Sequence, residues 1–534
     1  MTLANGLLPN QWKTANVIQL HKKDEKDNPK NYRPISLTSC VCKVLEKIIF
    51  KHIHNHCKDN NLLSKKQSGF TPKDNTTNQL CDLYNSICIS LDNSRDLRAV
   101  FLDISKAFDK VWTRGLLSKI KSFRIKGKLF NWIIDYLTNR KQRVFLDGKY
   151  SKWSEVKAGV PQGSILGPIF FLIYINDLTE NIKSNIRLFA DDTMIYAEVD
   201  DPKITSDLLN SDLERINNWS KRWLVNFSPE KTRTLTFSTR RTKQIYPDLY
   251  LNNIKIKETD NHKHLGLTFS NNGKWEEHLD NIGKKTNKRL NMIKQLQFNL
   301  DRQTLQTLYF TYVRPLMEYG DIVWNNINEN QIEFLDNIQM TAARLVTGAV
   351  RRTKHAAIQN ELEWQSLARR RENHQLILLH KIVNEETPSY LKDKIHIEEE
   401  NYYYNRNREN TPYIRPIFAR TNLYFNSFFP SVIRKWNSLN KKDKNQPLEV
   451  FKNELNKRQK PSAYFTYGSR PGQIYLARLR MLCSNLNHHK CLRYLSDDPT
   501  CKCGHHMEDI KHFLFECSEY SNIRNSTLNT LPIG

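Results

Sequence analysis

The chain has 534 residues, of which 82 are Lys or Arg and 56 are Asp or Glu, so its formal net charge is +26. A charge this positive favours nucleic acid as the partner over a merely basic soluble protein or a membrane-surface binder, because no amphipathic basic helix dominates the charge distribution. No run reaches the roughly 18 apolar residues of a membrane span, and the ten cysteines, in a chain without a secretory signal, indicate reduced thiols or metal ligands.

The first 95 residues are predicted to be mostly helical. A strand is expected at 15–20, ahead of a loop rich in Lys and Asp, and helices are expected near 41–58 and 77–93.

Residues 96–260 mix strands with helices. The Asp-Gly pair within 142–150 is typical of a two-residue hairpin turn. The remaining expected elements are strand 97–103, a helix at about 202–223 and strand 232–237. Their order predicts an α+β sheet with helices packed on one face.

Two acidic sites lie at predicted strand ends. Asp191 and Asp192 separate two apolar runs, which predicts strand, tight turn and strand with both carboxylates at the tip. An isolated Asp-Asp pair is usually a solvated turn. Flanked by apolar residues, however, two adjacent carboxylates are costly as bare charges, and a divalent cation removes that cost. Two-metal phosphoryl transfer needs a further carboxylate on another strand, and Asp103 fits.

Further motifs surround these carboxylates. The run Gly159-Val-Pro-Gln-Gly-Ser-Ile-Leu-Gly-Pro168 precedes an apolar segment, 169–175. The others are Asn31–Leu37, Gln67–Phe70, Trp219–Trp223, Asn226, Lys231-Thr232 and His264–Leu267. In this order and spacing, the series resembles the reverse transcriptases of non-LTR (LINE-type) retrotransposons, most closely the jockey-like elements of animals, over roughly residues 11–350.

The resemblance implies a right-hand polymerase fold of the α+β class. It places the fingers at 1–95, the palm at 96–270 with some finger elements inserted, and a helical thumb with following helices at 271–384. A basic, aromatic, mainly helical or irregular region would occupy 385–480, and a small zinc knuckle 481–534.

The resemblance also implies the metal ligands. Asp103 and Asp191 would bridge two Mg²⁺ ions, with Mn²⁺ as the alternative, and the backbone carbonyl of Ile104 would add an oxygen ligand. Asp192 would lie beside the site and tune the ions.

Four residues match the nucleotide-binding positions of the family. Phe108 would exclude a 2′-hydroxyl and so select dNTPs, with a core phenylalanine as the alternative. Gln162 would contact nucleotide and template, Arg33 the triphosphate and Lys231 the departing pyrophosphate. The Arg that commonly follows the Gly-Phe pair is replaced here by Thr71-Pro72, and the candidate substitutes for its charge are Lys65, Lys66 and Lys73.

The C-terminal cluster Cys501, Cys503, His512 and Cys517 offers three thiolates and one imidazole, a tetrahedral donor set that Zn²⁺ closes. A closed site is structural, and the resemblance is to the zinc knuckle that ends many of these proteins. The nearby substitutes are His505, His506 and Cys491.

Aromatic residues also alternate with arginines after residue 400. Tyr402–Tyr404 together with Arg406, Arg408, Arg415 and Arg420 would suit single-strand stacking, and packing against the thumb is the alternative.

The resulting expectation is an RNA-directed DNA polymerase that extends a DNA 3′ end on an RNA template, using dNTPs. The family implies a nicked chromosomal primer and hence the nucleus, with a cytoplasmic ribonucleoprotein stage. No nuclease domain fits in the sequence, so a truncated element is expected. The alternatives are an inert nucleic-acid-binding relic and a maturase-like reverse transcriptase of group II introns.

Overall fold

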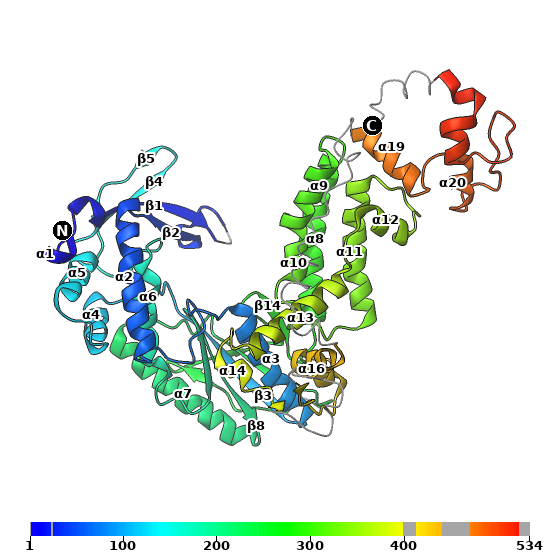
Figure 1. The fold of residues 1–534 in the computed structure, drawn as a ribbon. Coiled ribbons are helices and arrows are strands. Elements are labelled where there is room, and N and C mark those ends of the chain that lie inside the picture. The colour runs from blue at the N-terminus through cyan, green and yellow to red at the C-terminus, as the bar shows by residue number, and fades with distance from the viewer. Residues whose placement is uncertain (1, 23–24, 243, 399–412, 440–469, 523–534) are drawn as a thin grey trace. The chain divides into compact units, whose positions relative to one another are not determined.

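The computed structural model describes residues 2–22, 25–242, 244–398, 413–439 and 470–522 (Figure 1). The chain forms two compact units. The first is Met1–Lys274 with Glu385–Lys394 and Ala419–Phe425, and the second is Trp275–Asn384 with Ile395–Phe418 and Asn426–Gly534. The second unit thus begins at residue 275, where the sequence predicted the thumb from 271. Among the described helices, none is long and apolar enough to cross a membrane.

The N-terminal sheet of the first unit has the strand order β2-β1-β4-β5, with β6 (Ser154–Glu155) on β4. β1 (Thr14–His21) pairs antiparallel with β2 (Tyr32–Leu37) and parallel with β4 (Lys141–Leu146). The predicted Asp-Gly turn is confirmed, since β4 returns through Asp147 and Gly148 to β5 (Lys149–Tyr150).

Four helices of the first unit precede or follow these strands. The predicted helices near 41–58 and 77–93 are confirmed as α2 (Cys40–Asp59) and α3 (Thr76–Asp92). The helices between residue 103 and β4 are α4 (Thr113–Ser122) and α5 (Gly127–Leu137).

The central sheet has the order β12-β9-β3-β8-β7. Its middle strand, β3 (Asp96–Asp103), pairs antiparallel with β8 (Asp192–Val199) on one side and β9 (Arg233–Phe237) on the other. β7 (Asn185–Phe189) lies outside β8, and β12 (Lys257–Glu258) outside β9.

Both faces of the central sheet are covered, so the prediction of helices on one face only is wrong. Val100 and Leu102 pack in one core with α6 (Leu166–Ile175) and α7 (Pro202–Trp223). Helix α3 covers the other face, where Ser86 contacts Tyr196 of β8 at 3.4 Å. Because helices cover both faces of the sheet, residues 96–102 of β3 are all buried, whichever face their side chains point to.

Two later segments belong to the first unit. In the first segment, which contains α14 (Ser389–Lys392), Tyr390 donates a hydrogen bond to Asp74 and Lys394 lies 3.3 Å from Asp82 of α3. In the second segment, which contains α15 (Asn422–Phe425), the backbone N–H groups of Arg420 and Thr421 donate to Asp92.

Arg420 therefore anchors a segment to α3. Its guanidinium also donates to Ser94, so this member of the predicted stacking set is already engaged within the protein. Tyr402–Tyr404, Arg406 and Arg408 lie outside the described residues.

The second unit is mainly helical, as expected for residues 271–384. α8 (Glu276–Leu296) packs on α11 (Glu329–Thr347), which packs on α13 (Leu367–Val383). The glycine at 283 brings the first pair together, because a Cβ there would lie 2.5 Å from the ring of Phe334. The unit also contains α9 (Arg302–Leu308), α10 (Arg314–Glu318), α12 (His355–Leu362), α16 (Phe428–Ser438), α19 (Arg470–Arg480) and α20 (Asn487–Cys491).

Candidate active site and C-terminal metal centre

The three predicted catalytic carboxylates meet at one end of the central sheet. Asp103 ends β3, Asp192 begins β8, and the register pairs these two residues directly. Asp191 lies in the tight turn between β7 and β8, beyond the closing pair Phe189 and Asp192. In this turn Ala190 adopts a φ of +54°, a left-handed conformation that costs free energy in residues other than glycine.

The carboxylates of this site are crowded. Removal from water and the neighbouring Asp191 and Asp103 raise the pKa of Asp192 to about 6. The pKa of Asp191 is also raised, mainly because burial disfavours its charged form. Clustered carboxylates with raised pKa values are typical of a site that binds a cation.

Three basic side chains lie around the acidic cluster. Lys231 Nζ is 3.5 Å from Asp103 Oδ2, an ion pair exposed to solvent. Lys22 and Arg33, on the β1–β2 hairpin, act through their charge to lower the pKa of Asp191. The structure thus brings the predicted Arg33 and Lys231 to the site. It adds Lys22, whose only sequence signal was its place in a basic loop after a strand.

The acidic site fits divalent cations by its donors. Asp103 Oδ2 is buried and accepts no hydrogen bond from the described residues. Ser105 donates to the carbonyl of Asn226 and Ser228 to that of Asp103, and the Ile104 carbonyl between them takes no part in these bonds. Hard oxygen donors of this kind suit Mg²⁺ or Mn²⁺. Among the described residues, only C-terminal groups bring three or more candidate ligand atoms within 4.8 Å of one another, so the three aspartates lie at one sheet end without placing three oxygens within that distance.

The Phe108 ring lies five residues beyond Asp103 and is half-buried. It stacks on Phe171 of α6, with ring centroids 4.7 Å apart, and meets the edge of Phe70 at 6.4 Å. Its position beside the acidic site, held by two aromatic neighbours, suits the predicted sugar selection.

Gln162 is held by the loop that carries Phe108. Its side-chain Nε2 donates to Asp109 Oδ1 at 2.9 Å, and its carbonyl accepts from Ser36 of β2 at 2.7 Å. Gly159 allows the close approach of the two loops, because a Cβ there would lie 2.7 Å from the Asp109 carbonyl oxygen. Burial raises the pKa of Asp109, opposed by its hydrogen bond from Gln162.

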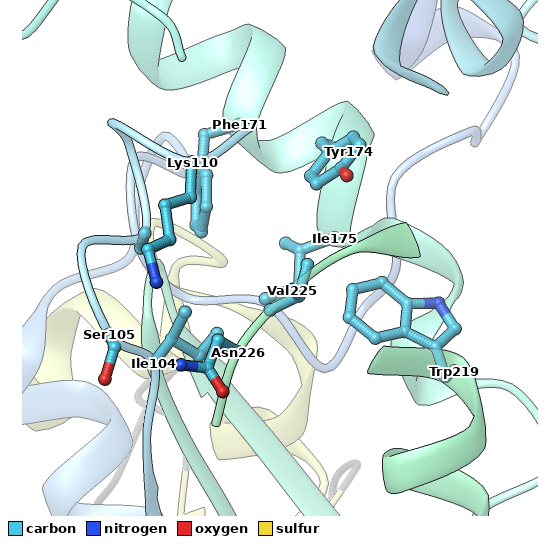
Figure 2. A pocket seen from close by; sticks show the side chains of 10 residues that line it. Ile104, Ser105, Lys110, Phe171, Tyr174, Ile175, Trp219, Val225 and Asn226 are labelled. Atoms are coloured by element: carbon cyan, nitrogen blue, oxygen red, sulfur yellow. The ribbon is translucent and has the colours of Figure 1, made fainter. Parts of the chain in front are cut away.

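A small pocket lies behind the loop that follows Asp103 (Figure 2). Its lining residues come from this loop, from α6, and from α7 and the segment that follows α7. Most of their side chains are apolar. Its lining residues are Ile104, Ser105, Ala107, Lys110, Phe171, Tyr174, Ile175, Trp219, Val225 and Asn226. Phe171 therefore contacts both this pocket and the ring of Phe108.

The four predicted zinc ligands come together at the C-terminus. Cys501 Sγ lies 3.6 Å from Cys517 Sγ, and Cys503 Sγ lies 3.2 Å from His512 Nε2. All four candidate ligand atoms lie within 4.8 Å of one another. Burial and hydrogen bonding with Cys503 and Cys517 raise the pKa of Cys501 to about 12, whereas the pKa of Cys503 is lowered, mainly by a backbone hydrogen bond. A bound cation would stabilise the Cys501 thiolate.

The three substitutes do not join this set of four. His505 stacks on the His512 ring at 4.1 Å, and its Nδ1 contacts the backbone carbonyl of Met507. It can group with His512 and Glu516, but not with the thiols. Neither His506 nor Cys491 belongs to either group. The geometry therefore favours the predicted ligand set.

Comparisons with known proteins agree with this geometry. The family model of the reverse transcriptase (RNA-dependent DNA polymerase) matches residues 20–269. The probable RNA-directed DNA polymerase from transposon BS of Drosophila melanogaster is 28% identical over 352 residues, which are 62% of this chain and 38% of that protein. The RNA-directed DNA polymerase from mobile element jockey of the same species is 27% identical over 381 residues, 69% of this chain and 41% of that protein.

This chain thus spans about two fifths of the length of these curated relatives. Among solved structures, apo telomerase from Candida tropicalis matches with a TM-score of 0.39 and 12% identity, over 66% of this chain and 60% of that chain. The likeness is too low to carry an argument about function. Over residues 20–269 the chain is thus similar to the reverse transcriptases, and the relatives named here are RNA-directed DNA polymerases of transposon BS and the mobile element jockey.

Proposed function

We propose that this protein is an RNA-directed DNA polymerase that extends a DNA 3′ end on an RNA template. The observation that carries the proposal is the pairing of Asp103 with Asp192 across β3 and β8, with Asp191 in the adjoining turn. Two Mg²⁺ ions held by Asp103, Asp191 and the Ile104 carbonyl would lower the pKa of the primer hydroxyl and offset charge on the triphosphate.

The protein's own residues would orient the nucleotide. Arg33 and Lys22 offer cations to the triphosphate from the N-terminal sheet, and Lys231 offers one beside Asp103. Phe108, held against Phe171, would exclude a ribose 2′-hydroxyl. Asp109 would hold the amide of Gln162 toward the nucleotide and the template.

The β4–β5 hairpin and the residues after it suit a single-stranded template. The Arg143 guanidinium lies over the rings of Tyr150 and Trp153, at 3.9 and 4.5 Å from their centroids. Both rings remain about half exposed, at 53% and 45%. The exposed lysines of this hairpin surface are Lys141, Lys149, Lys152 and Lys157. Exposed aromatic rings among cations bind single strands by stacking and by phosphate contacts.

A duplex contact is proposed for the second unit. Lys284, Lys285 and Lys288 are exposed on α8, while Ile282 and Leu290 of the same helix are buried. One face of this helix therefore offers cations for the phosphates of the primer–template duplex.

The zinc proposal rests on Cys501, Cys503, His512 and Cys517, whose donor set is the kind that a structural Zn²⁺ closes. The bound metal would stabilise the fold of a small module that grips RNA or target DNA. A DNA primer in the chromosome would make the nucleus the site of action.

Primer extension tests the proposal. Purified protein is given an RNA template, a DNA primer, dNTPs and Mg²⁺, beside Asp191→Asn and the control Asp207→Asn, which removes an exposed carboxylate from α7. We expect extension by wild type and control, and a loss of at least a thousandfold in Asp191→Asn. Extension by none of the three would favour the nucleic-acid-binding relic.

A further inference from the structure

The turn that carries Asp191 is held from outside its own hairpin. Gln67 lies in the segment before α3, and its Oε1 accepts the backbone N–H of Ala190 at 2.9 Å and that of Gly69 at 2.8 Å. We propose that Gln67 is a positioning residue for Asp191, because this amide oxygen holds Ala190 in the left-handed conformation that aims the next residue. The inference deepens, and rests on, the proposed polymerase function.

The orientation of the Gln67 amide follows from its partners. Both groups that point at it are N–H donors, so only the oxygen can accept from both. Gln67 Nε2 is buried and has no hydrogen-bond partner among the described residues. The side chain is 6% exposed, so water competes little for the oxygen. We call Gln67, Gly69 and Ala190 the Gln67 clamp.

The backbone brings Gln67 to this place. Gln67 forms a parallel bridge with Leu188 of β7. On either side, Ser68 donates to the Leu188 carbonyl and Leu188 donates to the Lys66 carbonyl, each at 2.9 Å. These bonds extend the central sheet by a short stretch beyond β7.

The clamp also requires glycine at position 69. A Cβ on Gly69 would lie 2.4 Å from the Ala190 nitrogen and 2.9 Å from the Phe189 carbonyl carbon. Contacts this short are not tolerated, so only glycine lets the two backbones approach.

The energetic role of the clamp is to offset strain. A non-glycine residue at positive φ costs free energy and persists only where its surroundings hold it. The methyl side chain of Ala190 forms no hydrogen bond of its own that could hold this conformation. The Gln67 Oε1 instead accepts hydrogen bonds from the backbone N–H groups of Ala190 and Gly69. Without the Gln67 oxygen, Ala190 is expected to relax and to move the Asp191 carboxylate.

The test compares two buried glutamines. Gln67→Met keeps length and apolar volume but loses the amide oxygen. The control Gln79→Met removes an amide that is 1% exposed on α3 and has no partner among the described residues. We expect Gln67→Met to lower kcat at least tenfold with less than threefold change in the KM for dNTP, since misplacing a reacting group by about 1 Å costs up to a hundredfold. The Mg²⁺ concentration for half-maximal rate should rise, and Gln79→Met should change neither quantity.

Rescue tests the strain argument. Glycine tolerates positive φ without the clamp, so Gln67→Met with Ala190→Gly should recover at least tenfold of the lost kcat. Absence of recovery would overturn the proposal. Equal losses of kcat in Gln67→Met and Gln79→Met, in proportion to their losses of thermal stability, would also overturn it and leave Gln67 a packing residue.

Amide hydrogen exchange separates this inference from the polymerase proposal. The Ala190 amide should exchange at least ten times faster in Gln67→Met than in wild type, whether or not the protein extends primers. Unchanged exchange would overturn the clamp. Faster exchange in Gln67→Met, found together with a wild-type protein that extends no primer, would support the clamp and refute the proposed function.

Discussion

The ring of Phe108 stacks on the ring of Phe171, with centroids 4.7 Å apart and planes 20° apart. Phe108 lies in the loop after β3 and Phe171 lies on α6, so the contact fixes this loop against the helix. Stacking of this kind adds about 0.5–1.5 kcal/mol beyond burial and restricts the Phe108 side chain.

Loss of the Phe108 ring should relax sugar selection. Phe108→Ala is expected to incorporate ribonucleotides at least tenfold more readily relative to dNTPs, with dNTP use largely intact. Phe171→Leu should give a smaller change of the same sign, because it loosens the gate without removing it. Single-nucleotide incorporation with dNTP and rNTP measures both. Unchanged discrimination in Phe108→Ala would return this ring to the core.

Proton and metal should compete at Asp192. The pKa of Asp192 in the folded protein, about 6, lies above the ordinary aspartate value of 3.8, so protonation of Asp192 stabilises the folded state. This contribution is complete below pH 3.8 and is lost as pH rises through about 6. The Mg²⁺ concentration needed for half-maximal thermal stabilisation should therefore fall between pH 5 and 7 and then level off. Asp192→Asn should flatten that dependence, and an unchanged slope would place the titration elsewhere.

Removal of zinc should unfold the C-terminal module locally. Cys503→Ser, or chelation, is expected to release protease sites within 481–522 while the central sheet stays resistant, because its core contains no residue of the cluster. Extension of a simple primed template should survive, and RNA affinity should weaken. Cys491→Ser is the matched control, since that thiol lies outside the ligand groups. Equal protease resistance with and without zinc would refute a structural metal.

Template affinity should depend on the hairpin surface and on salt. Trp153→Ala is expected to weaken single-stranded RNA binding by about 1–3 kcal/mol, the range for one stacking partner, with little change in the salt slope. Lys152→Ala should instead reduce the slope, because one fewer counterion is released. Filter binding between 50 and 200 mM salt separates the two effects. A flat salt response in the wild type would exclude this basic surface as the binding site.

Local pattern predicted much of the site. Asp191 lies in the expected turn, whereas Asp192 is already the first residue of β8, and the zinc ligands meet because their spacing within 501–517 is short. The strand β2 was missed because Pro34 argues against a strand, and the structure places β2 at a sheet edge, where proline is tolerated. The parallel pairing of β1 with β4 joins residues more than 120 positions apart, which no local pattern reveals.

The contact of Gln67 was missed for the same reason, because its partner is distant in the sequence. Its motif was recognised, but its hydrogen bond to Ala190 spans 123 positions, and only the fold brings the two together. Lys22 was overlooked for a related reason, since its charge acts on Asp191 from another sheet.

The return of Glu385–Lys394 and Ala419–Phe425 to α3 constrains where the gene can be interrupted. The three aspartates proposed to be catalytic all precede residue 193. A stop codon after residue 384 would nevertheless remove the backbone N–H groups of Arg420 and Thr421 that donate to Asp92, and the Lys394 side chain that lies beside Asp82. A recombinant fragment meant to retain the first unit should therefore extend past residue 425, and a frameshift before that residue would damage the unit that contains Asp103, Asp191 and Asp192.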